Sequence, residues 1–174
     1  MARQVELRRH TDNDGDALTA DGVRAAVDLG MRLEGSYDVL VSTGAQRATQ
    51  TLACLLAGLG ERVPGGTVVE PGLRSQEEDR WRAAAKQAGS SDLNAIRSVD
   101  PDLVEQEAAT LGAALRRVFE LLPVGGRALV VGHSPTNEAA VLGLTGQVVR
   151  PLGKGAGVLL SAGEDGVDVA PLPG

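Results

Sequence analysis

The chain has 174 residues, of which 43% are hydrophobic and 23% are charged, a composition typical of globular proteins that bury a core. Its formal net charge of −6 argues against nucleic-acid binding, which requires a basic surface. No apolar run approaches the length of a membrane span, and the N-terminal residues lack the charged and apolar regions of a secretion signal. We therefore expect neither a nucleic-acid partner nor membrane association.

Length and cysteine content favour one domain in a reducing compartment. A chain of this size is expected to form a single domain over residues 1–174. The only cysteine, Cys54, forms no internal disulfide, which fits a cytoplasmic location. Because Cys54 lies among Leu and Ala residues, we expect it to be buried with a structural role. The sequence does not indicate an oligomeric state.

The first expected element is a short strand that ends beside a histidine. Val5 and Leu7 alternate with polar residues, as in a strand with one buried face. The strand leads into Arg9 and His10, and a polar loop over residues 12–16 follows. Ligand crevices in open α/β sheets form at the carboxyl ends of strands, so His10 occupies a position suited to a ligand site.

Two helices and a strand follow. Thr19 is a suitable N-cap for a helix that Gly35 closes. A short strand over residues 37–42 precedes a second helix, which carries Arg47 in its first turn. The apolar face expected for the first helix comprises Val23, Ala26, Val27, Gly30 and Leu33. The face expected for the second comprises Ala48, Leu52, Leu55, Leu56 and Leu59.

The middle of the chain combines a polar insertion with a long helix. A third short strand covers residues 67–70, and a Pro-Gly pair ends it. Residues 73–102 are mostly polar and predict a lid of one or two short helices, with Trp81 as its anchor on the body. Apolar residues at helical spacing then predict a helix over residues 102–122.

The second histidine follows another apolar strand. Residues 128–131 are all apolar and lead through a glycine to His133. We expect a helix to start at Ser134, which would cap it, with Pro135 at its first position. The chain has no other histidine besides His10, and both occupy the same kind of position at the end of a strand.

Strands that alternate with helices predict a three-layer α/β/α sandwich around a mostly parallel sheet. Strands over residues 157–161 and 167–171, joined by a glycine-rich turn, predict a hairpin at its edge. The strand-to-helix junctions of such a fold share one rim. Since His10, Arg47 and His133 all lie at these junctions, we expect them to converge.

The residues expected at this rim suit phosphoryl transfer. Arginine guanidinium groups bind phosphate oxygens in a bidentate manner, and helix N-termini favour anions. A neutral imidazole is a competent nucleophile toward phosphorus. Arg9, Arg47, His10 and His133 supply both kinds of group, and positioning with charge neutralisation provides most of the catalysis of this reaction. Lys154 could also line the rim and attract an anion.

Four segments, in order along the chain, resemble motifs of the histidine phosphatase superfamily, the phosphoglycerate-mutase-like group. The segments are Arg9-His10-Thr11, Leu18-Thr19 with Gly22 and Leu29-Gly30, Thr43 to Thr51, and Gly132-His133. They resemble, in that order, an Arg-His-Gly signature, a Leu-Thr-x-x-Gly first helix, a Ser-Pro-Leu-x-Arg-Ala-x-Gln-Thr segment and a second catalytic histidine. The resemblance is to the small single-domain branch of this superfamily and spans most of the chain.

This resemblance implies a fold and a mechanism. His10 would attack the phosphorus and carry a phosphohistidine intermediate. Arg9, Arg47 and His133 would hold the phosphoryl oxygens and stabilise the transition state. A carboxylate would protonate the leaving oxygen and then activate water. No metal or organic cofactor is implied, and the partner is a small phosphorylated molecule or a protein that carries phosphohistidine.

The chain departs from these motifs at two turns. Thr11 stands where the family has glycine, and Thr43-Gly44 replaces Ser-Pro, which keeps a hydroxyl and loses a rigid turn. Thr11 and the helix start at Ser134 are expected to contribute to phosphate binding.

The position of the general acid also differs. The family's Leu-x-Glu falls on a segment that ends in Ser75, and serine is no proton donor at neutral pH. Glu77 and Glu78 lie just beyond and could supply the carboxylate, and Glu77 is preferred because it is nearer. Without an acid, hydrolysis of substrates with poor leaving groups slows by roughly 100-fold.

The sequence therefore predicts a metal-independent phosphatase for a phosphomonoester or a protein phosphohistidine. Because Ser75 replaces the acid, a phospho-ligand-binding domain with weak or lost catalysis is the alternative. A phosphoglycerate-type mutase is less expected, since the insertion over residues 73–102 is modest.

Overall fold

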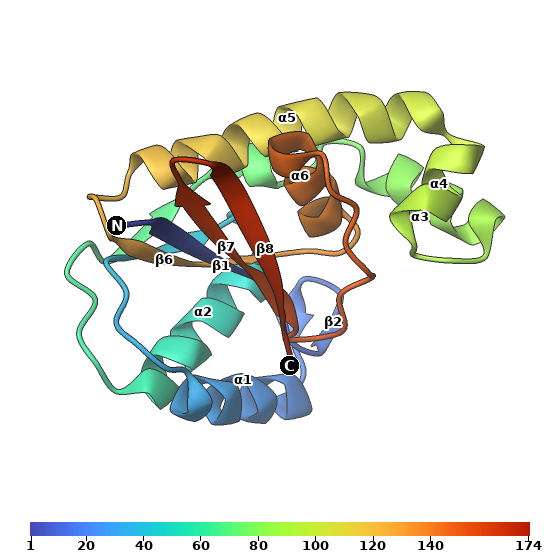
Figure 1. Ribbon diagram of the computed structural model, residues 1–174. Coiled ribbons are helices and arrows are strands. Elements are labelled where there is room, and N and C mark those ends of the chain that lie inside the picture. Colours follow the sequence, from blue (N-terminus) through green and yellow to red (C-terminus); the bar gives the residue numbers. More distant parts are fainter.

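A computed structural model describes all residues from Met1 to Gly174, with a six-stranded sheet at its centre (Figure 1). The strand order is β5-β4-β6-β1-β7-β8. The first four strands in this order pair in parallel, whereas β7 and β8 form an antiparallel hairpin at one edge. The strands are β1 (Arg3–Arg9), β4 (Val39–Ser42), β5 (Thr67–Val69), β6 (Arg127–Gly132), β7 (Gly157–Gly163) and β8 (Gly166–Leu172). The predicted sheet and edge hairpin are confirmed.

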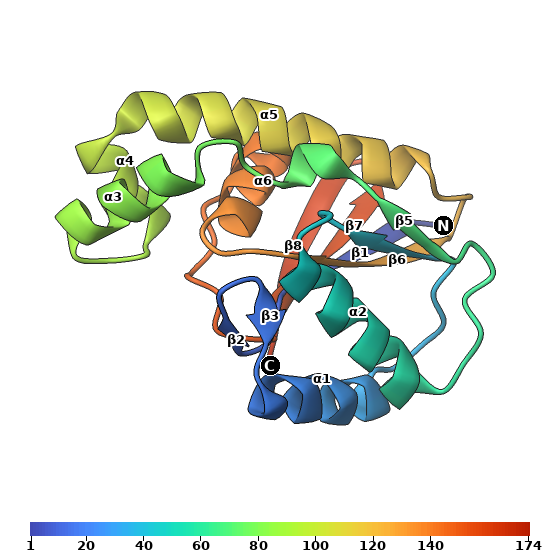
Figure 2. The same cartoon turned by 180° about the vertical axis from the view of Figure 1, so that it is seen from behind.

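Helices cover both faces of the sheet and give the predicted three-layer sandwich (Figures 1 and 2). The helices are α1 (Ala20–Arg32), α2 (Gln46–Leu59), α3 (Glu78–Ala88), α4 (Leu93–Val99), α5 (Pro101–Glu120), α6 (Thr136–Thr145) and the short 3-10 helix η1 (Pro71–Leu73). α1 and α2 cover one face, and α5 and α6 cover the other. None of these helices combines the length and the apolar character that a membrane span requires.

Side-chain alternation along the strands divides the core into two layers. In β4, Val39 and Val41 pack on the face that α5 and α6 cover, whereas Leu40 packs on the face that α1 and α2 cover. All three are at most 8% exposed, and burying each contributes roughly 1.5–3 kcal/mol. A slip of one residue would turn every one of these side chains to the opposite face. The apolar pattern thus fixes the register that sets the strand ends.

The first helix has the predicted cap and a partly different buried face. The Thr19 side chain accepts a hydrogen bond from the Gly22 N–H, as expected of an N-cap. Val23, expected in the core, is 40% exposed, while Leu29 is buried at 4%. The face is rotated because α1 packs closely on α2 at Gly30. A Cβ atom at Gly30 would lie 2.3 Å from a backbone carbonyl oxygen of α2.

Two local predictions require correction. Helix α6 begins at Thr136 with Pro135 at the N-cap position, so Ser134 does not cap it. The Ser134 hydroxyl instead donates to Glu138 Oε1 at 2.5 Å, because a carboxylate is a stronger acceptor than the alternatives nearby. The polar loop after β1 forms a small hairpin, β2 (Asn13–Asp14) and β3 (Ala17–Leu18), in place of a simple turn.

The predicted lid consists of α3 and α4 and is anchored in the core. Trp81 is 3% exposed, which confirms its anchoring role. Leu93 and Ile96, both at most 1% exposed, join it in the same apolar cluster as the side chains of α5. Figure 1 shows α3 and α4 beyond one end of the sheet, under the start of α5. This packing makes the insertion part of the body.

Cys54 is half-buried, less buried than the sequence predicts. The residue lies on α2 beside the exposed Ala53, at the margin of the buried face of the helix. Burial raises the pKa of the Cys54 thiol, so the thiolate form is disfavoured.

Candidate active site

The two histidines meet at the carboxyl ends of neighbouring parallel strands. Arg9 of β1 is in register with Gly132 of β6, so each histidine is the residue that follows its strand. The His10 N–H donates to the Gly132 carbonyl oxygen at 3.0 Å and extends the pairing by one residue. The ring centroids of His10 and His133 lie 5.4 Å apart, with an angle of 56° between the ring planes. The predicted convergence is therefore present.

The contacts of His10 fix its tautomer. Nδ1 lies 2.8 Å from the carbonyl oxygen of Thr11. A carbonyl oxygen only accepts, so Nδ1 carries the hydrogen and donates it. In the neutral ring the lone pair is then on Nε2, which is the nitrogen left free to attack an electrophile.

His133 is held by Thr43, which belongs to one of the sequence motifs, and by Asn137, which belongs to none of them. Its Nε2 lies 2.8 Å from the Thr43 hydroxyl, and its backbone N–H donates to Asn137 Oδ1 at 3.2 Å. The Asn137 side chain also donates to the Arg8 carbonyl oxygen at 3.1 Å, so it ties the ends of β6 and β1 together. His133 Nδ1 is buried and has no protein partner. Its hydrogen-bonding capacity is therefore unused within the protein.

Both imidazoles are uncharged at neutral pH. Burial, with smaller contributions from Lys154, Arg47 and Arg9, outweighs the hydrogen bond to Thr11 and lowers the pKa of His10 to about 4. Burial lowers the pKa of His133 to about 3, and the positive charge of Arg47 contributes. The nearby cations that help to keep the rings neutral also favour an anion at this position.

Arg47 is held in place by Asp16 from the β2–β3 hairpin. The Asp16 carboxylate accepts from the Arg47 guanidinium at 2.8 Å, and from the backbone N–H groups of Gln46 and Arg47 at 3.2 and 3.3 Å. Burial acts to raise the pKa of Asp16, but these hydrogen bonds outweigh it and lower the pKa. Asp16 thus caps α2, which has no side-chain cap of its own, and fixes the guanidinium.

Arg9 is anchored by the segment that connects α6 to β7. Its Nη1 donates to the Leu152 carbonyl oxygen at 2.9 Å, while Nε is buried without a partner. Burial lowers the pKa of Arg9, and the nearby Glu138 opposes that shift. Arg8 points to the opposite face of the sheet, as side-chain alternation predicts, and donates to Glu6 at 2.6 Å. The positive charge of Lys154 lies close enough to His10 to help lower the pKa of that imidazole.

The phosphate-binding role that the sequence predicts for Thr11 is not visible in its hydrogen bonds. Its hydroxyl donates to the Gly22 carbonyl oxygen at 2.8 Å, and its backbone N–H donates to Thr51 Oγ1 at 3.2 Å. Both donors are therefore occupied within the protein. Ser134 lines the cavity described below, but its hydroxyl hydrogen is directed to Glu138.

The structure does not place Glu77, the preferred carboxylate, in the lining of the cavity described below. Glu77 is exposed and occupies the N-cap position of α3, where its charge acts on Arg80. Glu78, one residue on, lines the cavity and accepts from Arg74 Nε at 3.0 Å. Its Oε1 also lies 3.8 Å from Arg47 Nη2. The start of α3 decides which of the two carboxylates turns inward.

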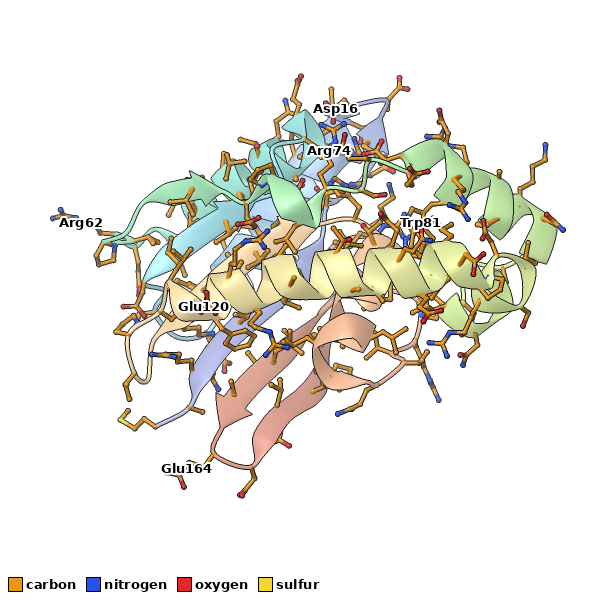
Figure 3. All side chains as sticks on the ribbon, turned by 90° about the horizontal axis from the view of Figure 1, so that it is seen from above. Asp16, Arg62, Arg74, Trp81, Glu120 and Glu164 are labelled. Atoms are coloured by element: carbon orange, nitrogen blue, oxygen red, sulfur yellow. The ribbon has the colours of Figure 1, made fainter.

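A cavity of about 280 Å³ opens over His133 between the rim of the sheet and the lid. Its lining comprises Arg47, Ser75, Glu78, Trp81, Arg82, Ala85, Ser91, His133, Ser134, Pro135 and Thr136. Figure 3 shows Asp16, Arg74 and Trp81 toward one end of the molecule, away from Arg62 and Glu164. Arg74 and the lid, which carries Trp81, thus lie on the same side of the molecule.

Solved structures with the same arrangement of elements are known. A phosphoglycerate mutase from Bacillus anthracis matches with a TM-score of 0.71 and 19% identity, over 98% of this chain and 92% of that chain. A phosphoserine phosphatase from Entamoeba histolytica, in complex with 3-phosphoglyceric acid, matches with a TM-score of 0.72 and 14% identity, over 99% and 98% of the two chains. This chain has the histidine phosphatase fold.

The histidine phosphatase fold is also that of the protein histidine phosphatase SixA, solved with tungstate. That structure matches with a TM-score of 0.55 and 22% identity, over 97% of this chain and 96% of that chain. The solved structures of this fold thus include both phosphatases and a mutase. No protein-family model matches the sequence, and no curated protein is significantly similar to it.

Within this histidine phosphatase fold, the sequence located His10, Arg9, Arg47 and His133 correctly at one rim. The sequence did not show which residues hold these four side chains in place. Thr43 begins one of the motif segments, but nothing in the motif linked its hydroxyl to His133, and Asp16 lay in a loop that resembled a solvated turn.

Proposed function

We propose that this chain is a metal-independent phosphatase of the histidine phosphatase superfamily that forms a phosphohistidine on His10. The observation that carries the proposal is the pairing of His10 with His133, whose ring centroids lie 5.4 Å apart among arginine side chains. The hydrogen bond from His10 Nδ1 to the Thr11 carbonyl oxygen supports the role of Nε2 as the nucleophile.

In the proposed reaction, His10 Nε2 attacks the phosphorus as the bond to the leaving oxygen breaks. Arg9 and Arg47 neutralise the phosphoryl oxygens, and His133, which lines the cavity and lies beside His10, holds one of them. Water then attacks the phosphohistidine and releases inorganic phosphate. Because the empty site keeps His10 neutral, the enzyme needs no deprotonation step before attack.

The carboxylate of Glu78 is proposed to position the cations of the site. It pairs with Arg74 at 3.0 Å and approaches Arg47 at 3.8 Å. Together with Asp16, it holds the Arg47 guanidinium from two sides. Fixed orientation of this kind lowers the reorganisation that accompanies charge development in the transition state.

The substrate class that we favour is a small phosphomonoester. The cavity of about 280 Å³ is closed on one side by lid residues, including Trp81, which suits a small molecule. The names of structures with this fold, a phosphoserine phosphatase and a phosphoglycerate mutase, agree with that class. A protein phosphohistidine is the second class, since a structure of this fold is named a protein histidine phosphatase.

The test is release of phosphate from p-nitrophenyl phosphate and from a panel of phosphorylated metabolites, with the purified chain and no added metal. Wild type is expected to turn over and to show an acid-labile phosphoenzyme, and His10→Ala is expected to lose both. A panel that includes a phosphohistidine peptide ranks the two substrate classes. Binding of phosphate without turnover would favour the ligand-binding alternative, and transfer between positions of one metabolite would favour a mutase.

A further inference from the structure

Glu107 is an acidic side chain within the apolar core beneath the lid. It lies on α5 and is 9% exposed, and its neighbours on the same face of the helix, Val104, Ala108 and Leu111, are all buried. An ionisable group in such surroundings is unfavourable unless hydrogen bonds satisfy it. Glu107 Oε2 accepts from two groups, the Ser75 hydroxyl and Trp81 Nε1, the latter at 3.1 Å.

Ser75 connects this carboxylate to the cavity. A serine hydroxyl has one hydrogen to donate and two lone pairs that accept. The hydrogen of Ser75 is directed to Glu107, and one lone pair accepts from the Glu77 backbone N–H at 2.9 Å. The second lone pair has no partner in the protein. Since Ser75 lines the same cavity as His133, that lone pair is available to accept a hydrogen bond from a water molecule.

We propose that Ser75 and Glu107 form a proton relay that serves both steps of the reaction. The inference rests on the phosphatase function proposed above. Ser75 touches the reacting water or leaving oxygen, and Glu107 acts through it as the proton store. The family resemblance expects an acid at the position of Ser75. The Glu107 carboxylate lies behind that position and is joined to it through the Ser75 hydroxyl.

The relay balances over one turnover. In the first step, the P–Nε2 bond to His10 forms and the P–O bond breaks. This step uses the protonated form of the relay, in which Glu107 donates to Ser75 and the Ser75 hydrogen turns toward the cavity. The Ser75 proton moves to the leaving oxygen and the proton of Glu107 replaces it, which leaves the carboxylate that accepts from Ser75 in the structure. In the second step, water attacks the phosphohistidine and gives one proton to Ser75, whose own proton returns to Glu107. The P–N bond breaks, and its electron pair returns to Nε2. The products are an alcohol and inorganic phosphate.

Glu78 is the competing proton carrier because it lines the cavity directly. Its Oε1 is already engaged by Arg74 and lies 3.8 Å from Arg47. Glu107 faces no arginine in its hydrogen bonds, only a hydroxyl and an indole. A carboxylate that exchanges protons with a neutral hydroxyl disturbs none of the ion pairs that hold the phosphoryl-binding cations. We therefore assign proton transfer to the relay and cation positioning to Glu78.

The test compares Ser75→Ala, Glu107→Gln and Glu78→Gln with wild type, and uses Glu105→Gln as the matched control. Glu105 lies on the same helix but is exposed to solvent. The glutamine at position 107 keeps an acceptor for Ser75 and Trp81 but cannot store a proton. Thermal midpoints equal to wild type in Glu107→Gln would show that the hydrogen bonds of the core persist, so any kinetic change reports proton transfer.

Kinetics with two leaving groups separate the steps. With p-nitrophenyl phosphate the first step needs no acid, so Ser75→Ala and Glu107→Gln should lower kcat and KM together by about 100-fold and leave kcat/KM near wild type. Phosphoenzyme should accumulate in a burst. With an alkyl phosphate, kcat/KM should also fall by about 100-fold, because the first step then needs the acid.

Other results would overturn the relay. Wild-type kinetics in Ser75→Ala and Glu107→Gln, with phosphoenzyme accumulation in Glu78→Gln alone, would assign proton transfer to Glu78. A proportional loss of kcat/KM for both substrates would indicate a structural effect of these two side chains. Failure of the underlying function is distinguishable, since His10→Ala would then retain wild-type turnover and no phosphoenzyme would form in any variant. That result would remove the relay and the nucleophile together.

Discussion

Replacing Asp16 should uncouple Arg47 from the site and destabilise α2 at the same time. The Asp16 carboxylate makes three hydrogen bonds, two to backbone N–H groups at the start of α2 and one to the Arg47 guanidinium at 2.8 Å. Helix α2 has no side-chain cap from Ala45, so Asp16 is its substitute cap. The change Asp16→Ala removes all three bonds.

The expected loss of stability follows from these contacts. Loss of an N-cap costs about 1 kcal/mol. The ion pair adds at most about 1 kcal/mol, because the Asp16 side chain is 46% exposed and water screens it. A total of about 1–2 kcal/mol should lower the thermal midpoint by about 3–6 °C in a domain of this size. An Arg47 side chain that is free to move should lower kcat/KM by about tenfold, which corresponds to about 1.4 kcal/mol of transition-state stabilisation.

The assay measures thermal unfolding and p-nitrophenyl phosphate hydrolysis for Asp16→Ala and Asp16→Asn. The asparagine side chain keeps an acceptor for the helix but lacks the charge, so it should recover most of the stability and little of the activity. Asp14→Ala, an exposed position in the same hairpin, serves as the control. If Asp16→Ala loses stability as expected but keeps wild-type kcat/KM, Arg47 does not depend on this carboxylate and the positioning role is wrong.

Three further results are expected. Thr43→Val leaves the buried Nε2 of His133 without its partner and should lower kcat/KM by about tenfold, measured with p-nitrophenyl phosphate, while the fold persists. In NMR titrations neither imidazole should change charge near pH 6.5, because burial holds the pKa of His10 at about 4 and that of His133 at about 3. Since the folded state binds these protons less tightly than the unfolded state, stability is fully present above about pH 6.5 and should decline in denaturant titrations as the pH falls from 6.5 toward 4. Gly30→Ala should lower the thermal midpoint, because its Cβ would lie 2.3 Å from a carbonyl oxygen of α2, whereas Gly153→Ala, which meets nothing within 4 Å, should not.

The convergence of the histidines could be predicted from sequence because it depends on short, local signals. An apolar strand followed by a histidine occurs twice, and parallel strands end at the same rim of a sheet. The alternating pattern of Val5 and Leu7 and the apolar run before His133 fix the register of these strands. This part of the site was predicted from short stretches of sequence and from the general geometry of parallel sheets.

The carboxylates of the site could not be predicted in the same way. Glu77 and Glu78 differ by one residue, and on a helix that difference turns the side chain by about 100°. Which one faces inward depends on where α3 begins, and the sequence places a helix boundary only within a few residues. Glu107 resembled an ordinary polar position on a long helix, since its partners, Ser75 and Trp81, are at least 26 residues away.

The charge pattern of the site explains how an acidic chain can bind an anion without binding it too tightly. Three cations near the histidines have a carboxylate close by: Arg47 pairs with Asp16, Arg74 pairs with Glu78, and Arg9 lies near Glu138. These pairs fix orientation and reduce the net positive potential of the empty site. Lys154, whose positive charge acts on His10, hydrogen-bonds to Asn13 and forms no ion pair with a carboxylate. The positive charge that no ion pair compensates therefore lies near His10, where the phosphoryl group is proposed to bind.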